Sequence, residues 1–173
     1  MTKRNSNSLV KWIKASLIAI ILAIILNTFI FSSSIVEGIS MEPTLIDNDR
    51  IIFNKLIYII SQPERGDIII IKQRDKKYIK RVIALPGETI EMSNHKLYID
   101  SVEQPTSYVD PSDEILTGSF GPLKVPKEHY FVMGDNRLVS KDSRNELGLI
   151  KRDEIIGKSE FIISPFNRWS RTK

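Results

Sequence analysis

The sequence contains no cysteine and only two histidines among its 173 residues. The absence of cysteine excludes disulfides, thiolate catalysis and Cys-ligated zinc. His95 lies in a turn and His129 precedes an apolar run, so neither has the setting of the base in a catalytic triad. Serine chemistry in this chain would therefore need another base, and a lysine is the recognised alternative. We expect no metal and no cofactor.

Negative charge is missing from the first 36 residues. Lys3, Arg4, Lys11 and Lys14 are the only charged residues before Glu37, and the chain has a net charge of +4. Without these four cations, the remaining 21 Lys and Arg balance the 21 Asp and Glu. The basic excess therefore belongs to the amino terminus, and a nucleic-acid partner has little support.

Residues 15–31 form a long apolar run without charge. About 17 to 25 such residues can cross a bilayer as a helix. Cations flank only the amino-terminal side of the run, and the next cation is Arg50. The positive-inside rule then predicts a single-pass protein of the cell membrane, with lipid as a partner. In this prediction residues 1–14 are cytoplasmic, 15–31 are the anchor, and 32–173 form an extracellular catalytic domain.

The apolar run has two other interpretations, a cleaved secretory signal and a buried core helix. A cleaved secretory signal would have similar charged and apolar regions, and Ser32, Ser33 and Ser34 supply small residues. However, the run is longer than the usual stretch of roughly 7–15 residues, and no A-x-A pattern follows it. A buried core helix is disfavoured because the segment has no polar face. We therefore favour a retained anchor.

The rest of the chain is predicted to be mainly β. Short runs rich in Ile, Val and Tyr, separated by turn formers, predict strands at 50–53, 67–72, 78–83, 89–92, 97–99, 130–133 and 155–163. The continuous apolar run at 68–71 indicates a strand covered on both faces. Residues 101–127 are polar and rich in proline, which predicts a long excursion or a small lobe. The basic residues 168–173 are expected to fray.

Three segments, 38–45, 78–87 and 134–144, contain the candidate chemistry, although each alone has an ordinary explanation. Ser40 could be a turn residue. Lys80 and Arg81 are neighbours in a predicted strand, so one of them must point toward the core side. Burial would lower the pKa of such a lysine. The alternative is an edge strand with both cations solvated. The segment 134–144 could be a structural polar loop.

Together these segments resemble the conserved boxes of bacterial type I signal peptidases. Ser40 begins S-M-x-P-T-L, Lys80 begins K-R-V-I-x-x-P-G, and Gly134 begins G-D-N-R-x-x-S-x-D-S-R. Arg65 begins a fourth box, R-G-D-[IV]-[IV]. The resemblance runs from the anchor to Pro165 and is similar to the short, single-anchor form of Gram-positive bacteria. It implies the mainly β signal peptidase/LexA-like fold, with coiled antiparallel sheets after one transmembrane helix.

The resemblance also implies an activity, namely a serine endopeptidase that removes signal peptides from secretory preproteins. Ser40 would be the nucleophile that forms an acyl-enzyme, and Lys80 its general base. Ser140 would orient the lysine amine. Asp142 and Arg144 would hold the loop as an ion pair. Asp135 and Arg137 would support the site. Shallow apolar pockets for small substrate side chains at −1 and −3 would be lined by Val36, Met41, Tyr78 and Ile79.

Gly38 is a departure from part of this family. Some relatives have a serine at this position, whose hydroxyl helps to bind the oxyanion. In this chain the backbone N–H of Ser40 would be the main donor, assisted by water or by Gly38 itself. One lost oxyanion donor can cost about 10²–10³ in rate.

Other classes of protein share some of these features. A LexA-like self-cleaving repressor uses the same Ser–Lys chemistry, but it would need a DNA-binding domain where this chain has its apolar run. A tethered β binding module with a vestigial site, or a plain anchored scaffold, needs no reactive pair. A separation beyond ~5 Å between the Lys80 amine and the Ser40 hydroxyl would favour the scaffold.

Overall fold

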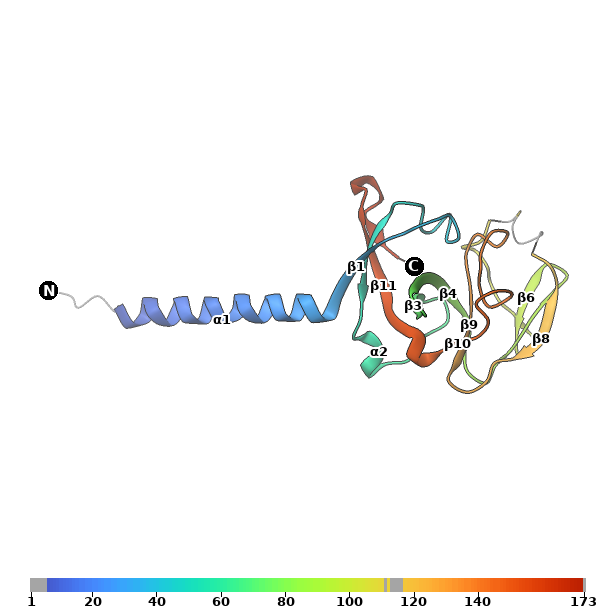
Figure 1. Ribbon diagram of the computed structural model, residues 1–173, viewed down its shortest axis with the longest axis horizontal. Coiled ribbons are helices and arrows are strands. Elements are labelled where there is room, and N and C mark those ends of the chain that lie inside the picture. The colour runs from blue at the N-terminus through green and yellow to red at the C-terminus, as the bar shows by residue number, and fades with distance from the viewer. Residues whose placement is uncertain (1–5, 111, 113–116, 173) are drawn as a thin grey trace.

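A long helix, α1 (Ser6–Ile30), projects from a β domain (Figure 1). The computed structural model describes residues 6–110, 112 and 117–172, and within α1 the side chains of 6, 7, 9 and 25–29 also lie outside the description. The predicted cytoplasmic segment is therefore described only in part, since Lys3 and Arg4 lie outside it. The side chains that are described between Val10 and Ile24 are exposed.

The predicted anchor, residues 15–31, coincides with α1 except at Phe31, which begins the first strand. Within the described residues, no helix has an apolar stretch long enough to qualify as a membrane span. Part of the predicted anchor, the side chains of 25–29, lies outside the described residues.

Among the described residues, the larger of two antiparallel sheets contains eight strands. Seven are neighbours in the order β1 (Phe31–Ile35), β2 (Arg50–Asn54), β11 (Ile155–Ser164), β3 (Ile68–Gln73), β4 (Lys76–Ala84), β9 (His129–Met133) and β10 (Ile150–Lys151). The eighth, β12 (Ser170–Arg171), pairs with β11. A short helix, α2 (Ile57–Ile60), and two 3₁₀ turns, η1 (Arg152–Glu154) and η2 (Phe166–Arg168), lie between strands.

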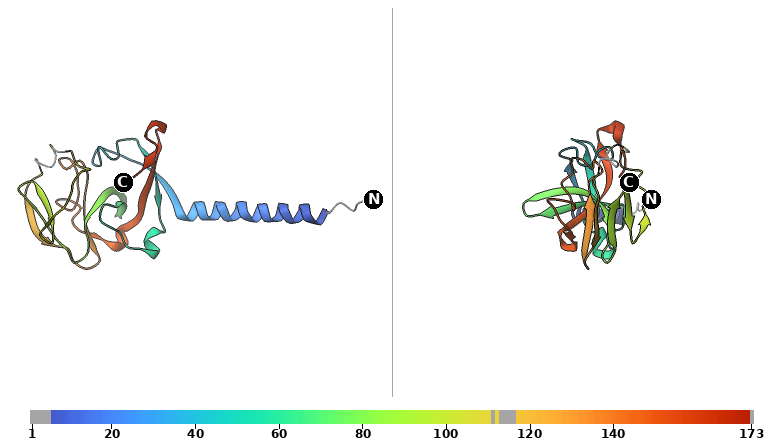
Figure 2. Two further views of the ribbon diagram at one scale, coloured as in Figure 1. Left: turned by 180° about the vertical axis from the view of Figure 1, so that it is seen from behind. Right: turned by 90° about the vertical axis from the view of Figure 1, so that its right-hand side faces the viewer.

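The smaller sheet has the order β7 (Val102–Glu103), β6 (Lys96–Ile99), β5 (Thr89–Ser93) and β8 (Phe120–Lys124). Its two outer strands come from the excursion at 101–127. It lies at the end of the domain away from α1, as both side views show (Figures 1 and 2). Each run that the sequence predicted to be a strand contains one.

The core consists of three apolar clusters, and β3 contributes to two of them. Ile69 and Ile71 pack with Val82 and Val132 on one face, while Ile68 packs in the cluster of Met41 and Leu45. All four residues at 68–71 are buried, with at most 2% exposed. The prediction of a strand covered on both faces is therefore confirmed.

Residues 168–172 are ordered, so the prediction that this segment frays was wrong for them, and Lys173 lies outside the described residues. The guanidinium of Arg168 pairs with the fully buried carboxylate of Asp49, with 3.1 Å between Nε and Oδ1. Ser170 and Arg171 then add strand β12 to the edge of β11. A buried carboxylate needs a partner, and Arg168 supplies it.

Candidate active site

Ser40 lies in a turn after β1 that is held from both sides. Met41 and Leu45, which follow it, are buried in the core, and the Leu45 N–H donates to the Met41 carbonyl at 2.9 Å. On the other side, the Asn136 N–H donates to the Ser40 carbonyl at 3.2 Å. The position of the Ser40 hydroxyl is therefore fixed by core packing and by the segment at 134–144.

Lys80 lies on β4 between β3 and β9, and its amine meets the Ser40 hydroxyl. Nζ donates to Ser40 Oγ at 2.7 Å, and Lys80 is only 3% exposed. This distance is well inside the ~5 Å beyond which a plain scaffold would be favoured.

The pKa of Lys80 is shifted toward the range in which a lysine can act as a base. Burial lowers it from 10.5 to about 8, although the charges of Asp142 and Asp135 raise it in part and Arg144 lowers it further. Burial dominates because it removes water from the charged amine. The sequence reasoning expected this direction.

Arg81, the next residue, points away from Lys80 and is buried as well. Its guanidinium forms a two-pronged ion pair with Asp135, with Nε–Oδ1 at 2.8 Å and Nη2–Oδ2 at 2.7 Å. It also lies over the ring of Tyr108 at 4.2 Å. The sequence required only one inward-facing cation, but both faces of β4 are covered. The alternative of an edge strand with two solvated cations is therefore wrong.

Gly134, which the sequence analysis did not single out as a site residue, lies where the segment at 134–144 crosses behind Ser40. A Cβ at this position would collide with the Ser40 carbonyl oxygen and the Ser140 hydroxyl. The Gly134 N–H donates to both Ser140 Oγ and Asp142 Oδ2 at 3.1 Å. The residue is thus required for the close approach, and its place at the head of the G-D-N-R box was the available signal.

Asp142 and Arg144 form the predicted ion pair, with both Nε–Oδ1 and Nη2–Oδ2 at 2.9 Å. Arg144 also donates to the Arg137 carbonyl at 2.7 Å. Burial alone would raise the pKa of Asp142, but the hydrogen bond and charge of Arg144, with hydrogen bonds from Ser140 and Gly134, leave that pKa lowered. Asp142 is therefore a buried anion that ties the loop together.

Ser140 and Arg137 are both buried near this loop. The Ser140 hydroxyl contacts Gly134 and Asp142, and in the described part of the chain no hydrogen bond joins it to the Lys80 amine. The Arg137 guanidinium lies 5.9 Å from the centre of the Tyr108 ring, and burial lowers the pKa of Arg137. Their expected roles, in orienting the amine and supporting the site, stay predictions.

A groove of about 660 Å³ opens over Ser40 and Lys80. Its walls contain all four residues predicted to form substrate pockets, Val36, Met41, Tyr78 and Ile79. Val36 and Met41 are at most 3% exposed, so they present only small apolar patches to the groove. Their role as pockets for small side chains at −1 and −3 stays a prediction.

Gly38 has a φ of +86°, a conformation that favours glycine. Its N–H donates to Asp47 Oδ1 at 2.7 Å. This N–H is therefore already engaged by a carboxylate and does not face an oxyanion. By contrast, the Ser40 N–H donates to no acceptor among the described residues.

The described residues contain no group of three His, Asp or Glu side chains placed to hold a metal ion. His129 contacts the Lys127 carbonyl with a ring nitrogen at 2.9 Å. His95 lies in the turn between β5 and β6. The side chain that contacts the Ser40 hydroxyl in this structure is Lys80.

Comparison with known proteins identifies relatives over nearly the full length. The family described as "Signal peptidase, peptidase S26" matches residues 9–164. Signal peptidase I T of Bacillus subtilis (strain 168) is 46% identical, covering 99% of this chain and 93% of the relative. Signal peptidase I P of Bacillus subtilis subsp. natto is 45% identical, covering 98% of this chain and 96% of the relative.

Among solved structures, the chain is similar to a crystal structure of a signal peptidase I from Enterococcus faecalis V583. The two share 33% identity, with a TM-score of 0.49, and the match covers 57% of this chain and 97% of that one.

Proposed function

The chain belongs to the S26 family of signal peptidases and is a type I signal peptidase, and we propose that Ser40 and Lys80 perform its peptide-bond cleavage. The observation that carries this proposal is the 2.7 Å contact between Lys80 Nζ and Ser40 Oγ at a buried lysine. A lysine with a pKa of about 8 is half neutral at pH 8. A solvated lysine would be neutral in only about 0.3% of molecules at that pH.

The proposed reaction begins when neutral Lys80 accepts the Ser40 proton while Oγ attacks the carbonyl carbon of the scissile bond. The Ser40 N–H donates to the oxyanion of the resulting tetrahedral intermediate. The Lys80 ammonium then protonates the leaving amine, and an acyl-enzyme remains on Ser40. A water molecule, deprotonated by Lys80, attacks the ester carbon; the bond from that carbon to Ser40 Oγ then breaks, Oγ takes the proton back from the Lys80 ammonium, and the signal peptide leaves with a new carboxyl end.

We assign the substrate's signal-peptide side to the groove over Ser40. Val36, Met41, Tyr78 and Ile79 line it, and the nearly buried Val36 and Met41 present only small apolar patches to a substrate. Small residues at −1 and −3 are therefore the expected specificity, and secretory preproteins the expected substrates.

The membrane arrangement is also part of this proposal. The apolar side chains of α1 that are described are exposed on all sides of the helix and need an apolar surrounding. We assign residues 15–31 to a single membrane anchor, with 1–14 in the cytoplasm and 32–173 outside. Ser40 follows soon after the anchor, so enzyme and signal sequence would search for each other within the plane of the bilayer, which raises their effective concentration.

The test compares cleavage of a preprotein by full-length chain carrying Ser40→Ala or Lys80→Ala. Each variant is expected to lose at least about 10³-fold in rate, because nucleophile and base act as a unit. Ser107→Ala and Lys127→Ala are matched controls, since both residues are exposed and outside the groove. Undiminished cleavage by both active-site variants would refute the dyad.

A further inference from the structure

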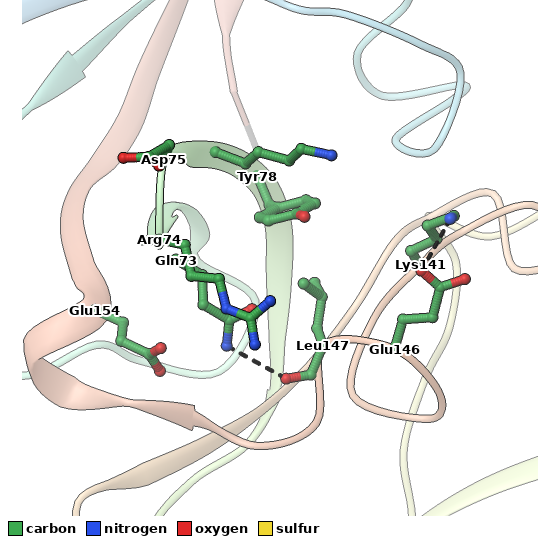
Figure 3. Close-up of a pocket in the computed structure, with 9 residues that line it drawn as sticks. Gln73, Arg74, Asp75, Tyr78, Lys141, Glu146, Leu147 and Glu154 are labelled. Carbon is green, nitrogen blue, oxygen red and sulfur yellow. Dashed lines mark hydrogen bonds and ion pairs between the residues drawn. The ribbon is translucent and has the colours of Figure 1, made fainter.

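A second hollow, of about 760 Å³, adjoins the catalytic groove (Figure 3). The two share Asp75, Lys76 and Tyr78, so they meet on β4 within two residues of Lys80. Its remaining walls come from the β3–β4 turn, from the loop that follows Ser140, and from Glu154. A peptide that crosses Ser40 and Lys80 can therefore continue from one hollow into the other.

The two hollows differ in chemistry. The catalytic groove presents apolar surface from Val36, Met41 and Ile79 beside charged side chains such as Glu37 and Lys77. The second hollow is lined mainly by charged and polar side chains, with its cations and anions in equal number: Arg74, Lys76, Lys141, Asp75, Glu146 and Glu154. This lining suits a polar segment of peptide better than an apolar one.

The direction of the substrate follows from the elements around the groove. Ser34, Ile35 and Val36 line the catalytic groove and belong to the chain that leaves α1. The signal peptide, held beside the anchor, therefore occupies this groove. The residues on the other side of the scissile bond must leave over a different surface, and the charged hollow borders the catalytic strand β4 through Lys76 and Tyr78.

Lys141 is the side chain best placed to act on that segment. Its backbone lies between buried Ser140 and buried Asp142, so its position relative to the catalytic residues is fixed. Its side chain is 63% exposed, and its amine pairs with Glu146, whose side chain is 65% exposed, at 2.9 Å (Figure 3). An exposed pair of this kind is weak because water screens it, so a substrate carboxylate can replace Glu146 at little cost.

We propose that the charged hollow receives the first residues of the mature protein and that Lys141 favours an acidic side chain among them. This inference rests on the proposed function, because it assigns the other half of the same substrate. Gln73 and Leu147, which also line the hollow, are joined by a hydrogen bond that Gln73 donates to the Leu147 carbonyl at 3.5 Å (Figure 3).

The experiment uses full-length enzyme in detergent and preprotein-derived peptides that differ only at the second residue after the scissile bond. Asp, Asn and Lys are compared by kcat/KM at low salt. The wild-type chain is expected to prefer Asp over Lys by about twofold to tenfold, with Asn between them. Lys141→Glu should reverse the order, and about 1 M salt should flatten it because screening is then strong. Lys127→Glu, an exposed lysine outside both hollows, is the matched control and should keep the wild-type order.

Each outcome decides one question. Equal cleavage of all three peptides by the wild-type chain overturns the inference and leaves the peptidase function standing. An Asp preference that survives Lys141→Glu, or that Lys127→Glu abolishes equally, also overturns it. If the wild-type chain cleaves none of the peptides and no preprotein, the proposed function fails and the inference falls with it.

Discussion

Removal of the Asp135 carboxylate should strongly destabilise the fold. Asp135 is fully buried and binds Arg81, whose side chain is 3% exposed. In Asp135→Ala the guanidinium loses two hydrogen bonds at 2.7 and 2.8 Å, while its hydrogen bonds to the Gly66 carbonyl at 2.9 Å and to the Thr44 hydroxyl at 3.3 Å remain among its contacts. Removal of one partner of a buried ion pair typically costs about 3–5 kcal/mol, a large part of an ordinary total of about 5–15 kcal/mol.

The assay is urea unfolding of the full chain in detergent, followed by circular dichroism. Glu103→Ala is the control, because it breaks the Lys96–Glu103 pair, whose side chains are 54% and 53% exposed. That variant should lose at most about 1 kcal/mol. A double variant with Arg81→Met and Asp135→Leu should be more stable than Asp135→Ala, since it leaves no unpaired charge.

The reasoning is refuted if Asp135→Ala and Glu103→Ala lose similar free energy of unfolding. It is also refuted if the double variant is less stable than Asp135→Ala, because the lost free energy of unfolding would then come from packing and not from the charge of the Arg81 guanidinium.

Three further predictions concern the site. Gly134→Ala should lower kcat/KM by about 10²-fold or more in protein that still folds by circular dichroism, because its Cβ would displace Ser40 or Ser140; near-normal activity would contradict the assigned close approach. Gly38→Ala should cost about 1–2 kcal/mol in urea unfolding, because φ is +86° there; an unchanged midpoint would show that the backbone can relax. Because the pKa of Lys80 falls from 10.5 to about 8 on folding, the unfolded chain binds more protons between these values. The stability of wild type relative to Lys80→Met should therefore rise from pH 8 to 10.5, by up to about 3 kcal/mol, and a flat difference would count against the buried amine.

Much of the fold could be predicted because its strands have clear apolar runs. The run at 68–71, for example, becomes the fully buried strand β3. Strand β8 was missed because Gly121 and Pro122 interrupt its pattern, and the strand forms by pairing with β5. Strand β1 was missed because its three consecutive serines show no alternation of apolar and polar residues. The strand forms because it pairs with β2.

Only part of the candidate site could be predicted from the sequence. Ser40 and Lys80 follow from motif order, and the lowered pKa follows from an inward-facing lysine. Pairings between distant segments could not be predicted from local pattern, because they depend on how the sheets are stacked. The contact of Arg168 with Asp49, which orders residues expected to fray, is such a case.

The central claim is that a buried, neutral Lys80 activates Ser40, and the pH dependence of kcat/KM tests it most directly. With a peptide that has no group titrating between pH 6 and 11, kcat/KM should rise through an apparent pKa of about 8, the value to which burial lowers the Lys80 amine. A rise with its midpoint near 10.5, or one near the histidine value of about 6.5, would contradict the account.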